Sequence, residues 1–415
     1  MKKKAWSWVP TLYFAEGLPY TIVMTLSVIM YKRFGMSNEA IAFYTGWFYL
    51  PWVIKPFWSP FVEIVRTKRW WILSTQLLIG AGFASIALSL PTPFYIQASM
   101  AMFWLVAFSS ATHDISADGF YILALDNKEQ SFFVGIRSTF YRLSTIFAQG
   151  FLVFLAGILE SHTGNIKLSW SIIFFITSGI FIGLYIYHKF VLPQNAENKA
   201  NKDKRAKEIL KEFVYVFRSF FSQKNIIIGL TFMLTYRLSE AMLVKITSPF
   251  LLDPVAKGGM GLSTSEVGIY YGTFGVIALL LGGILGGMAI SKKGLKHWFI
   301  PMTLALTLPN AVYLLLSIFQ PDSRFWVASS IVAEQFGYGF GFTAYMMYLI
   351  EFSKGEYKTA HYSICTGFMA LGMMIPGMIS GVCYLFLGYK GLFTLIMLLV
   401  IPTIAIAIFT RKTLK

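Results

Sequence analysis

The stretch LPQNAENKANKDKRAKEILKE, residues 192–212, is the longest polar run in a chain of 415 residues. Elsewhere the chain is mainly apolar: 56% of its residues are hydrophobic and 13% are charged, against roughly 25% charged residues in a soluble domain. A chain with so much apolar surface cannot fold in water, so we predict a polytopic membrane protein. Residues 192–212 then divide its membrane-spanning part into two groups of helices.

Apolar runs on both sides of this segment have the length that crosses a bilayer as a helix, about 20 residues. We predict twelve spans near residues 8–31, 40–62, 70–90, 94–124, 131–159, 168–190, 225–252, 264–290, 297–319, 323–352, 358–386 and 389–410. The predicted fold class is an all-α membrane protein with twelve transmembrane helices in two six-helix halves. The predicted domains are an N-terminal bundle over 1–191, a partly helical cytoplasmic linker over 192–224, and a C-terminal bundle over 225–415.

Lysine and arginine are distributed unevenly between the predicted loops. The side that carries the N-terminus has 24 of them and the opposite side has 6. Because basic loops stay in the cytoplasm, this bias places both termini inside the cell. It also accounts for the net charge of +16. Since the charges are dispersed over the inner face, we expect no nucleic-acid partner.

Ionisable side chains interrupt several predicted spans. The acids are Glu16, Asp114, Asp118, Glu240 and Glu334, and the bases are Lys55, Arg137, Arg142, Arg237 and Lys245. Each would cost on the order of 3 kcal/mol at the bilayer centre. We therefore expect these groups to face one another or an internal, water-filled chamber. The alternative is a set of buried ion pairs that only determine helix register.

Two aspartates lie in the stretch FSSATHDISADGFYILAL, residues 108–125. Asp114 and Asp118 are four residues apart, so they share one face of a helix. Like charges this close, in a medium of low dielectric, favour protonation of one carboxyl group, as a proton-coupled carrier requires. We expect Arg137 and Arg142 to lie near enough to neutralise them.

Other polar residues suggest more local roles. Arg237 and Glu240 are three residues apart, so we expect them to pair on their own helix. His113 either makes a satisfied polar contact or has a pH-linked role. Neither Cys365 nor Cys383 has a metal-type spacing, and we interpret both as packing residues.

Aromatic residues accompany the charges in the middle of predicted spans. They are Tyr13, Tyr20, Tyr49, Trp52, Tyr141, Tyr236 and Tyr345. Aromatic rings stack on the apolar faces of sugars and phenol groups bond to hydroxyls, so this set suggests a glycan-like solute. Simple packing is the alternative for each of them.

Several motifs resemble those of a known family. They are EGLPYTIV (16–23), YLPWVIKPFWSPFVE (49–63), ATHDISADGF (111–120), FYRLS (140–144), YRLSEAM (236–242) and VAEQFGYGFGFTAYMMYL (332–349). Their order and spacing resemble the AmpG-type muropeptide permeases of the major facilitator superfamily, which are related to acetyl-CoA transporters. The resemblance implies proton-driven import of anhydro-muropeptides across the bacterial inner membrane for peptidoglycan recycling. By the same resemblance, Lys55, Asp114, Asp118, Arg142, Glu240 and Glu334 occupy motif positions.

We therefore predict a proton-coupled secondary transporter that works by alternating access. The predicted substrate-binding residues are Tyr13, Glu16, Lys55, Arg142, Tyr236, Arg237, Glu334 and Tyr345. The predicted proton-coupling residues are Asp114, Asp118 and Glu240. We expect a monomer in the lipid bilayer whose partners are protons and a small amino-sugar or muropeptide substrate, with no metal, no cofactor and no enzymatic activity.

Three alternatives remain at this stage. The chain imports another amino-sugar disaccharide or glycan fragment, it is a membrane-embedded enzyme acting on a lipid-linked sugar, or it is a solute sensor without transport.

Overall fold

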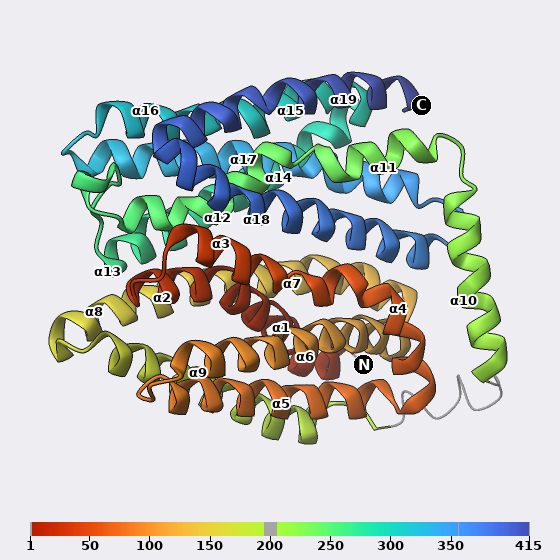
Figure 1. Cartoon of the computed structure of the whole chain (residues 1–415). Coiled ribbons are helices and arrows are strands. Elements are labelled where there is room, and N and C mark those ends of the chain that lie inside the picture. The colour runs from red at the N-terminus through yellow and green to blue at the C-terminus, as the bar shows by residue number, and fades with distance from the viewer. Residues whose placement is uncertain (1, 195–205, 356, 415) are drawn as a thin grey trace. The chain divides into compact units, whose positions relative to one another are not determined.

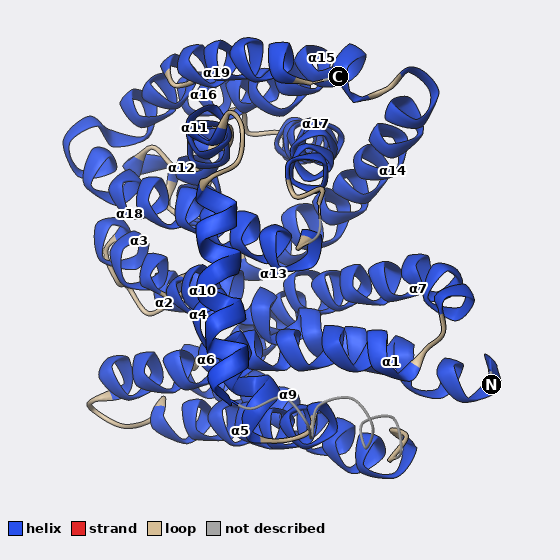
Figure 2. Ribbon diagram, turned by 90° about the vertical axis from the view of Figure 1, so that its right-hand side faces the viewer, coloured by secondary structure: helices blue, strands red, loops and turns tan. Residues whose placement is uncertain are grey.

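The structure is a computed structural model that describes residues 2–194, 206–355 and 357–414. Helices account for nearly all of these residues, and no β-strand occurs in the described ranges (Figures 1 and 2). The prediction of an all-α protein is confirmed. Residues 195–205, in the predicted linker, lie outside the described part of the chain.

The helices follow one another with short connections. The first are α1 (Lys2–Thr21), η1 (Ile22–Leu26), α2 (Ser27–Arg33), α3 (Asn38–Trp47), α4 (Leu50–Val65), α5 (Lys68–Ser89), α6 (Tyr95–Ala124), α7 (Asn127–Thr145), η2 (Ile146–Leu152), α8 (Val153–Thr163) and α9 (Ile166–Val191). After α10 (Ala206–Phe221) come α11 (Ile226–Thr235), α12 (Leu238–Leu252), η3 (Val255–Lys257), α13 (Thr264–Val267), η4 (Gly268–Gly275), α14 (Val276–Lys293), α15 (Leu295–Thr307), η5 (Leu308–Asn310), α16 (Ala311–Phe319), α17 (Arg324–Phe352), α18 (Lys358–Leu398) and α19 (Val400–Thr413).

These elements correspond to the predicted spans. Eight helical segments among the described residues are long and apolar enough to cross a membrane. The last of them, Ala360–Thr413, contains the two final predicted spans, which are separated at Gly388 by a left-handed φ of 61°. The other predicted spans are the pair α3–α4 and the helices α6 and α17, whose polar side chains reduce their apolar character. Each predicted span thus coincides with helical structure among the described residues.

Several spans contain irregular backbone. The segments η1, η2 and η4 are π-helical, and η5 is a 3-10 turn between α15 and α16. The chain also leaves the helix at Tyr236 and Arg237, between α11 and α12. Such interruptions in a helix often accompany functional sites, because they free backbone groups and redirect side chains.

The chain divides into two compact units. The first contains Met1–Leu26 and Ile54–Val214, and the second contains Ser27–Val53 and Tyr215–Lys415. The segment Ser27–Val53, with α2 and α3, thus packs with helices from the C-terminal part of the sequence. Each domain that we predicted is a continuous stretch of the chain, unlike these two units. The predicted boundaries stay a prediction.

Polar contacts hold this segment inside the second unit. Lys32 Nζ lies 2.7 Å from Asp253 Oδ1. Asn38 Nδ2 donates to the hydroxyl of Tyr389 at 2.9 Å, and that hydroxyl also bonds to Asp253. Because all four side chains are largely buried, this network positions α2 and α3 against α12 and α18 with more specificity than apolar packing alone.

Glycines permit a close helix crossing in the second unit, between α14 and α17. A Cβ added to Gly282 would lie 2.2 Å from the backbone oxygen of Phe336. One added to Gly339 would lie 2.0 Å from the backbone oxygen of Leu279. Real Cβ atoms do not come this close to backbone, so the two helices can touch only through residues without a side chain.

We predict that Gly339→Ala lowers the free energy of unfolding by about 1–3 kcal/mol, because a backbone oxygen cannot turn away from the added methyl group. Thermal unfolding of the detergent-solubilised protein measures the change. Gly183→Ala on α9 is the matched control, since a Cβ there meets nothing within 4 Å. A Gly339→Ala variant as stable as Gly183→Ala would contradict the close crossing.

Candidate functional site

Four helices of the first unit, α1, α4, α6 and α7, surround a group of charged side chains. The helices α1 and α7 approach at Gly17, where an added Cβ would lie 2.7 Å from the backbone oxygen of Tyr141. A capping box formed by Asp126 and Glu129 begins α7. These local features place the polar face of α1 against the polar faces of α6 and α7.

An arginine, an aspartate and a tyrosine from three of these helices form a closed set of hydrogen bonds. The hydroxyl of Tyr13 donates to Asp118 Oδ1 at 2.9 Å and accepts from Arg137 Nη1 at 2.8 Å. Arg137 Nη1 also lies 3.1 Å from Asp118 Oδ1. The guanidinium carbon is 4.8 Å from the ring centre of Tyr13 and 5.0 Å from that of Tyr121. The predicted neutralisation of an α6 aspartate by an α7 arginine is confirmed for this pair.

The second aspartate of α6 has a different cation. Lys55 Nζ, on α4, lies 3.4 Å from Asp114 Oδ2. Each aspartate therefore has an ion-pair partner of its own. The repulsion from which we predicted a proton shared by Asp114 and Asp118 is thus compensated by two positive charges.

A third acid lies beside these pairs. Glu16 on α1 is buried, and its Oε2 has no hydrogen-bond partner. It is within electrostatic range of both ion pairs. Arg142 adjoins the group through Tyr141, whose electrostatic neighbours include Arg142, Asp114 and Glu16. The first unit thus brings together six of the predicted residues: Tyr13, Glu16, Lys55, Arg142, Asp114 and Asp118.

Part of this group is open to solvent. The side chain of Asp118 is 46% exposed and that of Arg137 is 31% exposed, although both project from helices with apolar flanks. Charges exposed to that extent would be too costly against lipid tails. This face of the first unit is therefore suited to contact with water and polar solutes.

In the second unit, our prediction of a local ion pair between Arg237 and Glu240 is wrong. Arg237 lies at the break between α11 and α12, with φ −105° and ψ 19°, so the helical i,i+3 relationship does not extend to it. Its guanidinium instead donates to the hydroxyl of Tyr338 and lies 4.7 Å from the ring centre of Phe342. Glu240 stays within electrostatic range of Arg237 but neither of its carboxylate oxygens has a hydrogen-bond partner.

Glu334, on α17, is buried in the second unit near Glu240. It accepts a hydrogen bond from the Tyr313 hydroxyl at 3.2 Å and one from Gln335 Nε2 at 2.9 Å. The structure thus places the two predicted acids of the second unit together. Their roles in substrate binding and proton coupling stay a prediction.

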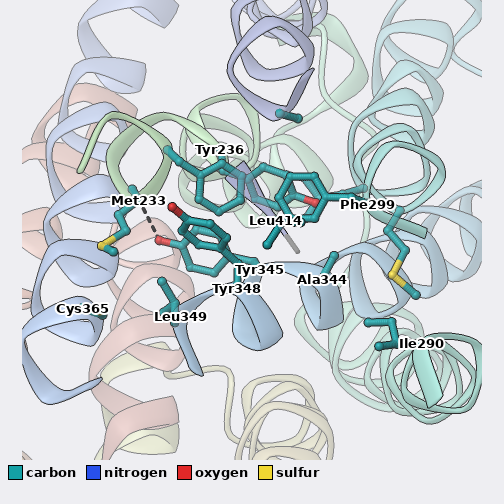
Figure 3. Packing of buried hydrophobic residues seen from close by; sticks show 14 of the residues in the cluster. Met233, Tyr236, Ile290, Phe299, Ala344, Tyr345, Tyr348, Leu349, Cys365 and Leu414 are labelled. Carbon is teal, nitrogen blue, oxygen red and sulfur yellow. Dashed lines mark hydrogen bonds between the residues drawn. The ribbon is translucent and has the colours of Figure 1, made fainter. Parts of the chain in front are cut away.

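Tyr236 and Tyr345 form part of the apolar core of the second unit (Figure 3). Their rings stack with centres 5.3 Å apart, and neither is accessible to solvent. The Tyr345 hydroxyl donates to the Met233 carbonyl at 2.7 Å, and that of Tyr236 donates to the Gly341 carbonyl at 3.3 Å. In this structure both rings act as packing residues, which was the alternative for these aromatics. Substrate contact stays a prediction for both.

His113 belongs to a buried polar network in the first unit. Its Nε2 lies 3.1 Å from Gln76 Nε2, and Gln76 in turn contacts His188. His188 Nε2 lies 2.9 Å from the hydroxyl of Thr11. The network joins α1, α5, α6 and α9, but it uses only Nε2 of His113, because Nδ1 is buried without a hydrogen-bond partner. Both expectations for His113 therefore stay predictions.

Several residues of these sites were not among those predicted from the sequence. Tyr338 follows Glu334 by one helical turn, so its position on the same face of α17 was readable from spacing. Tyr313 and Tyr271 come from other helices, and no sequence signal connects them to Glu334. Within the described ranges, no group of three or more histidine, cysteine, aspartate or glutamate residues is arranged to hold a metal ion.

Comparison with known proteins places this geometry in a family. The sequence model of the Major Facilitator Superfamily matches residues 11–277. The anhydromuropeptide permease of Escherichia coli (strain K12) is 24% identical over 418 residues, which cover 97% of this chain and 79% of that protein. A Rickettsia felis protein named AmpG 4 is 24% identical over 411 residues, which cover 96% of this chain and 94% of the relative.

Solved structures share the fold. A POT family transporter in complex with a thioalcohol conjugated peptide has a TM-score of 0.75 at 13% identity, covering 98% of this chain and 96% of its own. The D-xylose-proton symporter has a TM-score of 0.71 at 11% identity with the same coverage of both chains.

We predict that Lys55→Met destabilises the protein by about 1–3 kcal/mol, because a largely buried carboxylate loses a charged partner. Asp114→Asn added to Lys55→Met should restore most of that loss, since the charge that needs the partner is removed. Thermal unfolding of the wild type, both single variants and the double variant gives the coupling energy.

Lys354→Met is the control for this cycle, because its exposed ion pair with Glu351 should contribute less than about 1 kcal/mol. A double variant whose destabilisation equals the sum of the two single losses would show that Lys55 and Asp114 are not coupled.

Proposed function

The chain belongs to the Major Facilitator Superfamily, and from this premise we propose that it imports anhydro-muropeptides across the bacterial inner membrane. The substrates would be N-acetylglucosaminyl-anhydro-N-acetylmuramic acid with or without its peptide. Import would be driven by the proton gradient and would proceed by alternating access, in which the binding site opens to each side of the membrane in turn. The chain would act as a transporter and not as an enzyme.

The observation that carries the proposal is the partly exposed charged group of the first unit. It combines two cations, two aspartates and a buried glutamate between apolar helices. A muropeptide presents carboxylates, amides and hydroxyls in one molecule, so it can exchange contacts with each member of such a group. The similarity to the Escherichia coli anhydromuropeptide permease along 97% of this chain supports the same substrate class.

Individual residues take the following roles in this proposal. Lys55 and Arg142 bind substrate carboxylates, because a flexible ammonium and a planar guanidinium both recognise that group. Tyr13 and Glu16 bond to hydroxyl and amide groups. Tyr236 and Tyr345 are fully buried and donate to backbone carbonyls in this structure, so their contact with substrate would require a rearrangement of the core around them.

The proposed orientation has both termini in the cytoplasm. The excess of lysine and arginine in the loops on that side, 24 against 6, supports it. In this orientation the C-terminal end of α9 faces the cytoplasm, and the connection between α12 and α13 faces the outside.

We predict that membrane vesicles containing the protein accumulate labelled anhydro-muropeptide when an inward proton gradient is imposed. Dissipating the gradient with an uncoupler should abolish accumulation while exchange of internal for external substrate continues. Vesicles from cells that lack the protein give the background. Uptake of another amino-sugar disaccharide without uptake of muropeptide would replace the proposed substrate, and accumulation that ignores the uncoupler would remove the proton coupling.

We predict that Arg142→Ala weakens binding of a carboxylate-bearing muropeptide by about tenfold to a hundredfold, because a charge-assisted hydrogen bond is lost. An analogue whose carboxylates are converted to amides should lose much less affinity. Arg66→Ala serves as the control, since Arg66 is exposed and lies over Trp70 at the end of α4. An equal loss for the acid and its amide would contradict the assignment of Arg142 to the carboxylate.

A further inference from the structure

Two buried glutamates of the second unit lie together without a countercharge in contact. Glu240 on α12 is fully buried, and Glu334 on α17 is 1% exposed. The two carboxyl groups are within electrostatic range of each other. Within the described part of the chain, neither forms an ion pair: the nearest cation, Arg237, donates to Tyr338 and lies over the ring of Phe342.

Their hydrogen bonding is incomplete. Both oxygens of Glu240 and Oε1 of Glu334 are buried and have no hydrogen-bond partner. The remaining oxygen, Oε2 of Glu334, accepts from the neutral donors Tyr313 and Gln335. A buried carboxylate without partners is costly, and two beside each other are more costly still. The pair therefore requires a positive partner.

The size of that partner is limited by the packing. The unpartnered oxygens have almost no surface accessible to solvent, so the structure leaves no room beside them for a hydrated ion or an ammonium group. A proton needs no volume beyond that of the carboxyl group that carries it. We propose that Glu240 and Glu334 hold a single exchangeable proton, that it rests on Glu240, and that it is the proton whose movement drives transport.

The hydrogen bonds decide which of the two acids carries the proton. Glu334 accepts two hydrogen bonds, and donors of this kind stabilise a carboxylate. Glu240 accepts none, so no hydrogen bond offsets the cost of burying its charged form. The neutral acid is thus Glu240 and the charged partner is Glu334.

The position of Glu240 makes the proton exchangeable. Glu240 lies in the first turn of α12, directly after the break at Arg237. The positive end of the α12 dipole and the nearby guanidinium both stabilise the carboxylate that remains when the proton leaves. A small rearrangement at the break, such as one that breaks the hydrogen bond between Arg237 and Tyr338, would favour release of the proton from Glu240.

Irregular backbone surrounds the pair. Tyr271 of the π-helix η4 has both glutamates among its electrostatic neighbours, and so does Tyr313, which follows the 3-10 turn η5. Asn310, the last residue of η5, is buried with neither amide atom hydrogen bonded. Interrupted helices are the usual place for ion sites in membrane transporters.

The charged and titratable groups that face the pair are few. From α17 they include Tyr338, from η4 Tyr271, from α16 Tyr313, and from the α11–α12 junction Arg237. Because the three tyrosines are neutral, Arg237 is the cation that can respond to loss of the proton. The link to transport rests on the proposed function, whereas proton binding by the pair can be measured without any substrate.

Infrared difference spectra of the purified full chain, between acidic and alkaline buffer, test proton binding directly. We expect the wild type to show the carbonyl band of a buried protonated carboxylic acid, lost at alkaline pH. Glu240→Gln should lose this band and Glu334→Gln should keep it. Glu351→Gln, at an exposed ion pair, is the control and should match the wild type. A wild-type band in Glu240→Gln overturns the proposal.

A second variant keeps the test valid if Glu240→Gln does not fold. Tyr313→Phe removes one donor to Glu334, so the pair should retain its proton into more alkaline buffer than the wild type. A Tyr313→Phe titration identical to that of the wild type overturns the proposal.

Transport measurements then test the role of the proton. In proteoliposomes, Glu240→Gln should exchange internal for external muropeptide at a rate similar to the wild type, but should show no gradient-driven accumulation. Accumulation at the wild-type level overturns the coupling role of Glu240. If no muropeptide is taken up even by the wild type, the proposed substrate fails while the infrared result stands by itself.

Discussion

A charge within an apolar helix must find its compensation inside the protein, and the arrangement of both units depends on this constraint. Lipid offers neither a counter-ion nor a hydrogen bond, so each ionisable side chain determines which helix has to lie beside its own. In the first unit, Asp118 of α6 pairs with Arg137 of α7, and Asp114 of α6 pairs with Lys55 of α4. The charged residues are therefore part of the packing as well as candidates for binding.

The two units meet this constraint in different ways. The first unit uses ion pairs that are partly open to water, which suits the binding of a polar solute whose own charges can replace one partner. The second unit buries Glu240 and Glu334 with only neutral hydrogen-bond donors in contact. A pair arranged in this way cannot remain doubly charged, so it is suited to a proton. In our proposal, solute recognition and energy coupling are thus assigned to different parts of the chain.

Close helix crossings allow these polar groups to be placed accurately. At Gly339 the backbones of α14 and α17 touch, and Glu334 lies little more than one turn earlier on α17. The π-helix η4 contains Tyr271 and the turn η5 precedes Tyr313, and both tyrosines lie near Glu334. Backbone contact at glycines brings the helices close together, and the helix interruptions influence which residues meet.

Much of the fold could be predicted from the sequence by itself, because the bilayer imposes a length and a composition on every span. The approximate positions of the spans and the break near Gly388 followed from apolar runs, whereas the helix interruptions inside the spans did not. The pairing of an α6 aspartate with an α7 arginine was expected from the predicted fold. Spacing failed for Arg237 and Glu240, since an i,i+3 relationship holds only in an unbroken helix. It also could not distinguish a tyrosine that lines a site from Tyr236 or Tyr345, whose hydroxyls bond to the backbone of the core. The tertiary structure alone decided which acids have an ion-pair partner and which have only neutral neighbours. Those neighbours come from helices distant in sequence, and the stability of a buried charge depends on every group around it.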